Sequence, residues 1–243
     1  MNRIRKLVMM LGMLLVSSVF VACSDDDDST FGAVPVNSVR VTGTSVTVIW
    51  SIVPNDKCAG YEVSILQGSR DGAVVASQSF DNRTCQGTFT GLQPNTRYVI
   101  KTQGKPGSGF SGAEVYYREF TTSPLVEVSV VGFDFYQVEG YNSDGELVKT
   151  DYYRVNLTWP AISQNNCGGY RINVYPGTIA SHTNQAAGSA VVSDPAVNSA
   201  TIEKLSPATT YTVVSYTAPN AMCDYANGEQ RMIEFTTPAA PAK

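Results

Sequence analysis

The sequence offers few side chains for catalysis, because it contains five cysteines and one histidine. A Ser-His-Asp or Cys-His site repeated in both halves, or a metal site with two histidine ligands, needs a second histidine. The sequence also has no glycine-rich loop that follows a strand and opens a helix to bind a phosphate. A pair of carboxylates, as in glycosidases, needs no such motif. We therefore expect no enzyme, no metal and no cofactor, and a carboxylate-dependent glycoside-active enzyme is the weakest alternative.

The first cysteine, Cys23, lies at the end of a segment typical of export. Basic residues at the N-terminus precede an uncharged apolar run over residues 7–22. This run is shorter than the roughly 20 apolar residues that span a membrane. The small residue Ala22 directly before Cys23 resembles the lipobox of bacterial lipoproteins, in which a diacylglycerol is attached to the cysteine thiol. The resemblance implies a signal peptide over residues 1–22 and lipidation of Cys23; an ordinary signal peptide is the alternative.

Four consecutive aspartates at residues 25–28 follow this cysteine. Such a run stays hydrated and extended through self-repulsion, so residues 23–33 are expected to form a lipidated acidic tether. The run also resembles the acidic signal of Bacteroidetes lipoproteins that reach the cell surface. We therefore expect a protein anchored in the outer membrane by lipid and exposed at the cell surface. The net charge of −4 and the absence of a basic cluster argue against nucleic acid as a partner.

The rest of the chain contains two copies of one unit. Four segments of the first half recur in the same order in the second half. Apolar side chains alternate within these segments, and turn residues separate them, which predicts short strands and a β-sandwich. The matching pairs are Val46–Trp50 with Arg154–Trp159, Cys58–Val63 with Cys167–Ile172, Leu92–Tyr98 with Leu205–Tyr211, and Glu119–Thr122 with Glu234–Thr237.

These motifs resemble the fibronectin type III domain. Each copy has a Trp on its second strand, a Tyr that opens the third, and a Leu-x-Pro-x-Thr-x-Tyr motif. In the family the last motif is a tyrosine corner, whose hydroxyl bonds the backbone a few residues upstream. The resemblance implies an all-β fold of two tandem immunoglobulin-like β-sandwiches. We expect these domains at residues 34–122 and 125–237, followed by a Pro/Ala tail at 238–243.

The same resemblance suggests how the remaining cysteines pair. Four cysteines allow three pairings, and export favours disulfides over metal binding. In this sandwich the loops that carry the cysteines share one end of each domain. The implied disulfides are Cys58–Cys85 and Cys167–Cys223, with free thiols as the alternative.

The two copies differ most before Trp159. An Asp-Gly pair at residues 144–145 lies between two alternating runs and predicts a long hairpin that extends past the second sandwich. The loop over residues 176–187 carries His182 and is expected at the same end. Exposed tyrosines suit recognition of sugars or proteins, although a plain hairpin also carries aromatics for structural reasons. The candidate ligand-binding residues are Tyr136, Tyr141, Tyr152 and His182.

Two functions are compatible with this organisation. The first is a non-catalytic binding or adhesion module at the cell surface, which contacts a glycan or a surface protein through the distal end. The alternative is a structural spacer or accessory subunit of a surface complex that handles polysaccharides. Fold class alone does not separate them, because this sandwich serves unrelated tasks.

Overall fold

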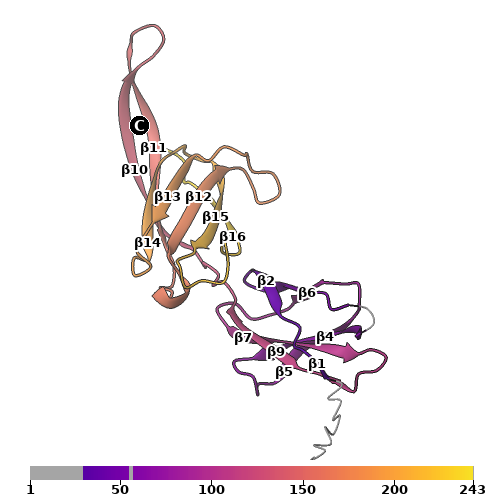
Figure 1. The fold of residues 1–243 in the computed structure, drawn as a ribbon. Helices are drawn as coiled ribbons and strands as arrows, with labels where there is room; N and C mark the ends of the chain where they lie inside the picture. Colours follow the sequence, from indigo (N-terminus) through magenta and orange to yellow (C-terminus); the bar gives the residue numbers. More distant parts are fainter. Residues whose placement is uncertain (1–29, 55–56, 243) are drawn as a thin grey trace, which may run out of the picture.

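The structure is a computed structural model that describes residues 30–54 and 57–242. The predicted signal peptide at residues 1–22, the lipidation site Cys23 and the acidic run at 25–28 lie outside the described residues. The fold is all-β and consists of two β-sandwiches stacked end to end (Figure 1). Within the described residues, no helix is long and apolar enough to cross a membrane.

The first sandwich packs a three-stranded sheet against a four-stranded sheet. The three-stranded sheet contains, in spatial order, β2 (Val36–Val41), β3 (Ser45–Trp50) and β6 (Gln86–Thr90). The four-stranded sheet contains β5 (Val74–Asp81), β4 (Cys58–Gln67), β7 (Arg97–Pro106) and β9 (Val115–Thr121). A short parallel pair, β1 (Thr30–Phe31) and β8 (Gly112–Ala113), joins the N-terminal segment to the connection between β7 and β9.

The second sandwich repeats this strand order. Its three-stranded sheet contains β10 (Ser129–Tyr141), β11 (Leu147–Thr158) and β14 (Ser199–Leu205). Its four-stranded sheet contains β13 (Gly188–Val192), β12 (Gly169–Pro176), β15 (Thr210–Ala218) and β16 (Arg231–Thr236). A 3₁₀ turn, η1 (Gln164–Asn166), lies between β11 and β12. The predicted all-β class with tandem sandwiches is therefore confirmed.

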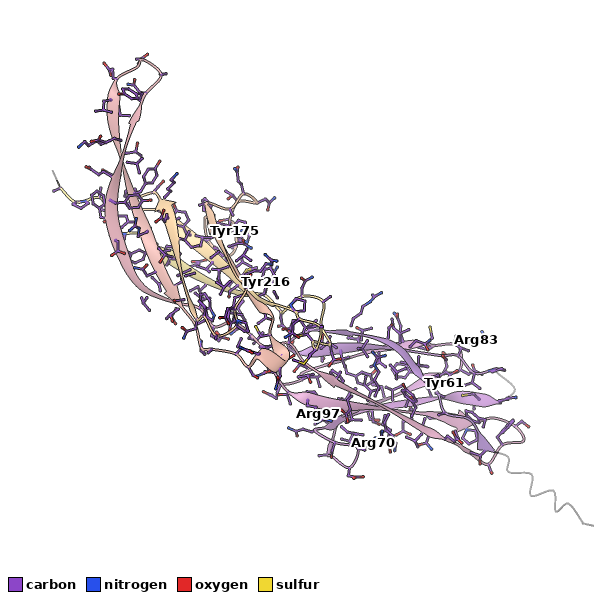
Figure 2. The ribbon with its side chains drawn as sticks, turned by 60° about the vertical axis from the view of Figure 1, so that its left-hand side comes forward. Tyr61, Arg70, Arg83, Arg97, Tyr175 and Tyr216 are labelled. Atoms are coloured by element: carbon purple, nitrogen blue, oxygen red, sulfur yellow. The ribbon has the colours of Figure 1, made fainter. Side chains whose placement is uncertain are left out.

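Strand alternation builds the two cores. On β3, every second side chain is buried, as a period of two requires for a sheet with one face inward. Trp50 packs against Tyr61 with ring centroids 5.8 Å apart, and Figure 2 shows Tyr61 within the first sandwich. The equivalent pair of the second sandwich, Trp159 and Tyr170, lies 5.1 Å apart. These aromatic residues are core residues, in agreement with the family resemblance.

Both predicted tyrosine corners are present. The hydroxyl of Tyr98 accepts a hydrogen bond from the backbone N–H of Gln93 at 2.9 Å. The hydroxyl of Tyr211 accepts the equivalent bond from Ser206 at 2.8 Å. Each bond fixes the connection that enters the strand of its tyrosine, so the two sandwiches share this device as well as their topology.

The junction between the sandwiches is built from loops of the second one. Tyr225, in the loop between β15 and β16, is 3% exposed and packs with the core of the first sandwich. Its hydroxyl donates to the backbone oxygen of Asn166 at 2.7 Å. The side-chain amide of Asn166 donates in turn to Asn95 Oδ1 and to the backbone oxygen of Thr122, both at 2.9 Å. These contacts connect η1 to the end of the first sandwich.

Two acidic residues of the same loop add further contacts across the junction. Asp224 accepts a hydrogen bond from the backbone N–H of Thr121 at 2.8 Å. Glu229 accepts one from the Thr44 hydroxyl at 3.1 Å, and its own N–H donates to Ser123 Oγ at 3.2 Å. Ser123 itself is fully buried. The short linker and these contacts together hold the two sandwiches as one elongated unit.

Candidate binding surface on the second sandwich

The predicted hairpin is formed by β10 and β11. Their antiparallel pairing runs from Ser129 opposite Thr158 to Tyr141 opposite Leu147. β14 pairs with β11 only as far as Tyr153, so the remaining ribbon has two strands and extends past the sandwich (Figure 1). The ribbon lies at the end of the molecule opposite β1, which is the end nearest the N-terminus.

A tight turn closes the ribbon. The side-chain oxygen of Asn142 accepts hydrogen bonds from the backbone N–H groups of Asp144 at 3.0 Å and Glu146 at 2.8 Å. Gly145 has a φ of 79°, a conformation that glycine adopts without a steric penalty. The Asp-Gly signal in the sequence therefore corresponds to the turn that it predicts.

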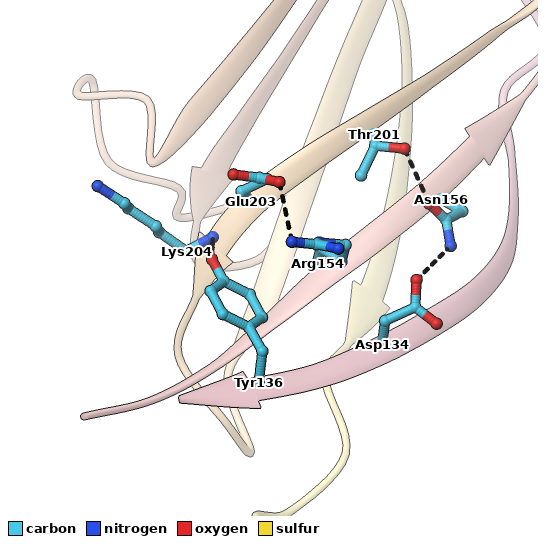
Figure 3. Close-up of polar contacts among 7 residues, drawn as sticks. All are labelled: Asp134, Tyr136, Arg154, Asn156, Thr201, Glu203 and Lys204. Atoms are coloured by element: carbon cyan, nitrogen blue, oxygen red, sulfur yellow. Dashed lines mark hydrogen bonds and ion pairs between the residues drawn. The ribbon is translucent and has the colours of Figure 1, made fainter. Parts of the chain in front are cut away.

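A polar network covers the outward face of the sheet at the base of the ribbon (Figure 3). Asn156 on β11 donates to Asp134 Oδ2 on β10 at 2.9 Å. Its side-chain oxygen accepts a hydrogen bond from Thr201 on β14 at 2.8 Å. One amide thus links all three strands, and it satisfies the polar groups of its neighbours within the protein.

Tyr136 belongs to the same face and has a structural role there. Its hydroxyl accepts a hydrogen bond from the backbone N–H of Lys204 at 2.8 Å, where the chain has a φ of 60° (Figure 3). The Arg154 guanidinium lies 4.9 Å from the Tyr136 ring centroid and pairs with Glu203 at 3.2 Å. Tyr152 lies opposite Tyr136 with ring centroids 6.0 Å apart. Tyr136 therefore fastens the ribbon to β14, and Tyr152 packs against it.

Aromatic side chains hold the inward face of the same base. Phe133 lies 6.3 Å from Tyr153 and 5.8 Å from Phe235 between ring centroids, and Phe135 lies 5.5 Å from Tyr153. The Tyr153 hydroxyl donates to the backbone oxygen of Ala239 at 2.9 Å, which binds the segment after β16 beneath the ribbon. The base is thus fixed on both faces, so the direction of the ribbon is set by packing.

The tip of the ribbon exposes apolar side chains. Tyr141 is 77% exposed and Leu147, directly opposite, is 59% exposed. Val138 and Val148 are 37% and 36% exposed and lie on the other face of the ribbon, because side chains alternate along a strand. Sequence reasoning named only Tyr141 of these residues. The sequence signal for the other three was the presence of apolar residues next to the Asp-Gly turn, in a segment that projects from the sandwich and has no neighbour to pack against.

His182 does not join the tyrosines of the ribbon. Its ring packs on Tyr175 with centroids 5.3 Å apart, and its Nδ1 lies 3.1 Å from the backbone oxygen of Thr183. The same loop is tied to β16 by a hydrogen bond from the Ile179 N–H to Glu234. Figure 2 shows Tyr175 on the second sandwich away from the tip of the ribbon. The four predicted residues therefore occupy three places: an outward face, a tip and a separate loop.

The four cysteines after Cys23 are free thiols in the structure. Cys58 and Cys167 are buried, and each thiol donates to a backbone oxygen two residues onward. Burial raises the pKa of the Cys167 thiol, and the neighbouring Cys223 raises it further. The disulfides Cys58–Cys85 and Cys167–Cys223 stay a prediction.

An opening of about 390 Å³ lies beside Cys167, at the end of the second sandwich that faces the first. Gln164, Asp194, Asn220 and Met222 are among the residues that line it. The Asn220 amide is engaged with the backbone oxygens of Gln164 and Cys167 at 2.7 and 3.1 Å. The amide of Asn220 thus holds together two loops at the junction and is not free to bind a ligand.

Comparison with known proteins bears on the first sandwich. Residues 34–117 match the family model described as "Fibronectin type III domain". No curated protein sequence matches the chain. This family match indicates no catalytic function.

Two solved structures from chicken are similar to the chain. The fragment with the FN1-FN3 domains of chicken CNTN1 is 14% identical, with a TM-score of 0.38; the match covers 85% of this chain and 66% of that one. A two-domain fibronectin type III segment of chicken tenascin is 16% identical, with a TM-score of 0.32; the match covers 84% of this chain and 97% of that one. This chain thus spans just under two thirds of the CNTN1 fragment, and neither similarity supports an inference about partners.

Proposed function

We propose that this chain, whose residues 34–117 form a fibronectin type III domain, is a non-catalytic binding module that presents the tip of the β10–β11 ribbon to a protein partner. The observation that carries the proposal is the exposure of Tyr141 and Leu147, side by side, on a ribbon that projects from the body. A tyrosine with aliphatic neighbours offers an apolar surface with one polar group, which suits protein recognition.

Two features of the molecule support this use of the tip. The base of the ribbon is fixed on both faces, so the tip needs little ordering when it binds, and less conformational entropy is lost. The outward tyrosines Tyr136 and Tyr152 pack on one another, and Tyr136 also bonds β14, which leaves the tip as the part of the ribbon with free apolar groups. Tyr141 therefore contributes more to recognition than Tyr136 and Tyr152 do. The mixed apolar surface at the tip favours a protein ligand over a glycan.

The proposal includes anchorage at the cell surface. Lipidation of Cys23 would attach the N-terminal end to the outer membrane, and the ribbon would then lie at the end farthest from the lipid (Figure 1). The Cys23→Ser substitution is expected to release the protein from the membrane fraction. Antibody labelling of intact cells tests whether the ribbon is exposed outside; labelling only after lysis would contradict surface display.

Binding is tested with the soluble chain from Ser29 to Lys243, which contains every described residue. It is screened against surface proteins and against a glycan array. The double substitution Tyr141→Ser with Leu147→Ser is expected to weaken binding of a protein ligand at least tenfold, on the scale of one hot-spot contact. A ligand that binds the wild type and the variant equally would exclude the tip.

The matched control removes apolar groups of similar exposure elsewhere. Val74 on β5 and Val191 on β13 are 59% and 60% exposed, and they lie away from the ribbon. Changing both to serine is expected to leave binding unchanged. Equal losses in the tip variant and in this control would indicate non-specific hydrophobic association.

The junction favours a second function, that of a stiff spacer. Buried Tyr225 and Asn166 fix the angle between the sandwiches, which a spacer needs in order to hold a partner at a set distance. Insertion of two glycines after Ser123 separates the functions. The variant that no longer assembles into its complex, but binds its ligand with unchanged affinity as a soluble protein, indicates a spacer. Unchanged assembly indicates a binding module alone.

A further inference from the structure

The outer edge of β10 is a long unpaired strand edge. β10 has 13 residues and lies at the end of its sheet, next to β11 alone. Within the described part of the chain, no backbone hydrogen bond from another segment reaches Phe133 to Tyr141, apart from those of the hairpin itself. An unpaired edge exposes N–H and C=O groups that form a ready template for another strand.

The pairing pattern identifies which groups face outward. At the end of the ladder, the backbone N–H of Asn142 donates to the oxygen of Glu146 at 3.0 Å, so this pair is hydrogen-bonded. Hydrogen-bonded and non-bonded pairs alternate in an antiparallel ribbon, and the residues of non-bonded pairs point their backbone groups away from the partner strand. The outward residues on the regular part of β10 are Phe133, Phe135, Gln137, Glu139 and Tyr141.

This edge lacks most of the usual protection against strand addition. Native edge strands are commonly kept short, or they carry a proline, a bulge or charged side chains, lysine above all. β10 contains no proline and no lysine, and its one irregularity lies between Val130 and Gly132, below the outward residues. The edge from Phe133 to Tyr141 is therefore regular over its whole length.

We propose that this edge pairs with the β10 edge of a second copy of the chain, antiparallel and centred on Gln137. A two-fold axis at Gln137 uses the whole regular edge, because Phe133 then lies opposite Tyr141 of the second copy. Every outward residue meets another outward residue in this register, so each backbone group finds a partner. The two ribbons would form a continuous four-stranded sheet.

The side chains also agree with self-pairing in this register. Phe133 faces a tyrosine, and Tyr136 faces Val138 of the second copy; aromatic pairs and aromatic–β-branched pairs both stabilise neighbouring strands. The two ionised residues of β10, Asp134 and Glu139, face Gly140 and Phe135 rather than each other. No like charges are therefore directly opposed.

The interface would be small. A pairing of one strand edge buries less than the roughly 1,200 Å² that marks the lower end of stable interfaces, so association should be weak and reversible. This inference does not depend on the proposed function, because it rests on the unpaired backbone groups of β10 and the side chains of the tip only add to it.

Sedimentation of the chain from Ser29 to Lys243 over a wide concentration range is the test. The wild type is expected to shift reversibly from monomer to dimer. Gln137→Pro removes the central outward N–H without removing a backbone hydrogen bond of the hairpin, since proline is tolerated where the N–H of an edge strand faces solvent. This variant is expected to stay monomeric at concentrations at which the wild type is dimeric.

The matched control is Asp151→Pro. Asp151 lies opposite Gln137, faces the other edge of the ribbon and is its side-chain hydrogen-bond partner at 2.8 Å. Both variants lose that bond, and both place a proline in the same pair of opposed residues. Only Gln137→Pro alters the β10 edge. Dimerisation that persists in Gln137→Pro or fails in Asp151→Pro overturns the proposal, as does a wild type that stays monomeric.

Amide hydrogen exchange of the wild type gives a second readout that needs no variant. The outward amides of β10, with Gln137 at the centre, should exchange rapidly in dilute protein and slowly in concentrated protein. The outward amide of Asp151 should exchange rapidly in both. Equal exchange of the Gln137 amide at both concentrations overturns the proposal.

Discussion

The buried tyrosine at the junction gives the sharpest test of how the two sandwiches are held together. Tyr225 comes from the second sandwich but packs with the core of the first, and it is 3% exposed. Replacing it with alanine removes an aromatic side chain from a closed site, which costs about 3–5 kcal/mol in proteins. Replacing it with phenylalanine leaves the ring but orphans the buried oxygen of Asn166, at about 1–2 kcal/mol.

The two variants separate packing from hydrogen bonding. Tyr225→Ala is expected to uncouple the sandwiches, so that denaturant unfolding splits into two transitions and small-angle scattering reports a broader range of lengths. Tyr225→Phe should lower the free energy of unfolding but keep one elongated shape. Unchanged unfolding and scattering of Tyr225→Ala would refute the conclusion that this residue fixes the junction.

The same tyrosine predicts a loss of stability in alkali. Burial raises the pKa of Tyr225 above its ordinary value of 10.0, so the folded chain keeps the phenolic proton to a higher pH than the unfolded chain. The stabilisation is fully present below pH 10 and is lost as pH rises from there through the folded pKa. The free energy of unfolding measured across this range should fall less steeply in Tyr225→Phe than in the wild type.

Three further predictions concern other parts of the fold. Ala208→Gly should raise the free energy of unfolding by about 1 kcal/mol, because Ala208 has a φ of 47°; a decrease in a denaturant melt would contradict this. Tyr136→Phe should cost about 1 kcal/mol by removing the hydrogen bond from the N–H of Lys204, and hydrogen exchange should show a looser base of the ribbon with an unchanged core. Protein exported from cells should contain the two predicted disulfides, each stabilising by about 2–4 kcal/mol, so a reductant should lower its Tm; peptide mapping that finds other pairs, or thiols, would disprove the pairing.

The sandwiches and their aromatic cores could be predicted from the sequence because their signals are local. Trp50 and Trp159 stand at the same place in two alternating runs, and the corner motif that ends in Tyr98 or Tyr211 has a fixed spacing. Each of these residues takes its position from its neighbours in the chain, so a repeated pattern gives a repeated structure.

The junction could not be predicted in the same way. Asn166 and Tyr225 lie in loops without periodicity, and their partners belong to the other sandwich. Between the two domains the sequence has only the short segment Ser123-Pro124. What fixes the angle is a set of contacts between residues far apart in the chain, which a reading of neighbouring residues does not detect.

The candidate site could be predicted only in part, because some of its contacts also join residues that are far apart in the chain. The Asp-Gly turn located the hairpin correctly, and Tyr141 lies exposed at its tip. Tyr136 looked equally available, yet its hydroxyl is engaged by Lys204, whose N–H is presented only because β14 adopts a left-handed conformation there. The use of a side chain on a sheet face depends on the register of the next strand, and Leu147 was overlooked because no periodic signal separates an exposed apolar residue from a buried one.

The contact surface that the first sandwich offers to the second has no equivalent on the second sandwich. This surface consists of the short turn at residues 42–44 and the turn that carries Asn95. In the second sandwich the first of these connections is the projecting ribbon, and the second carries Ala208, which has no side-chain amide. Another sandwich could not dock there by the same contacts. In the terms used for repeat proteins, the second sandwich resembles a capping unit, because the contacts that stack it on the first are not repeated at its far end.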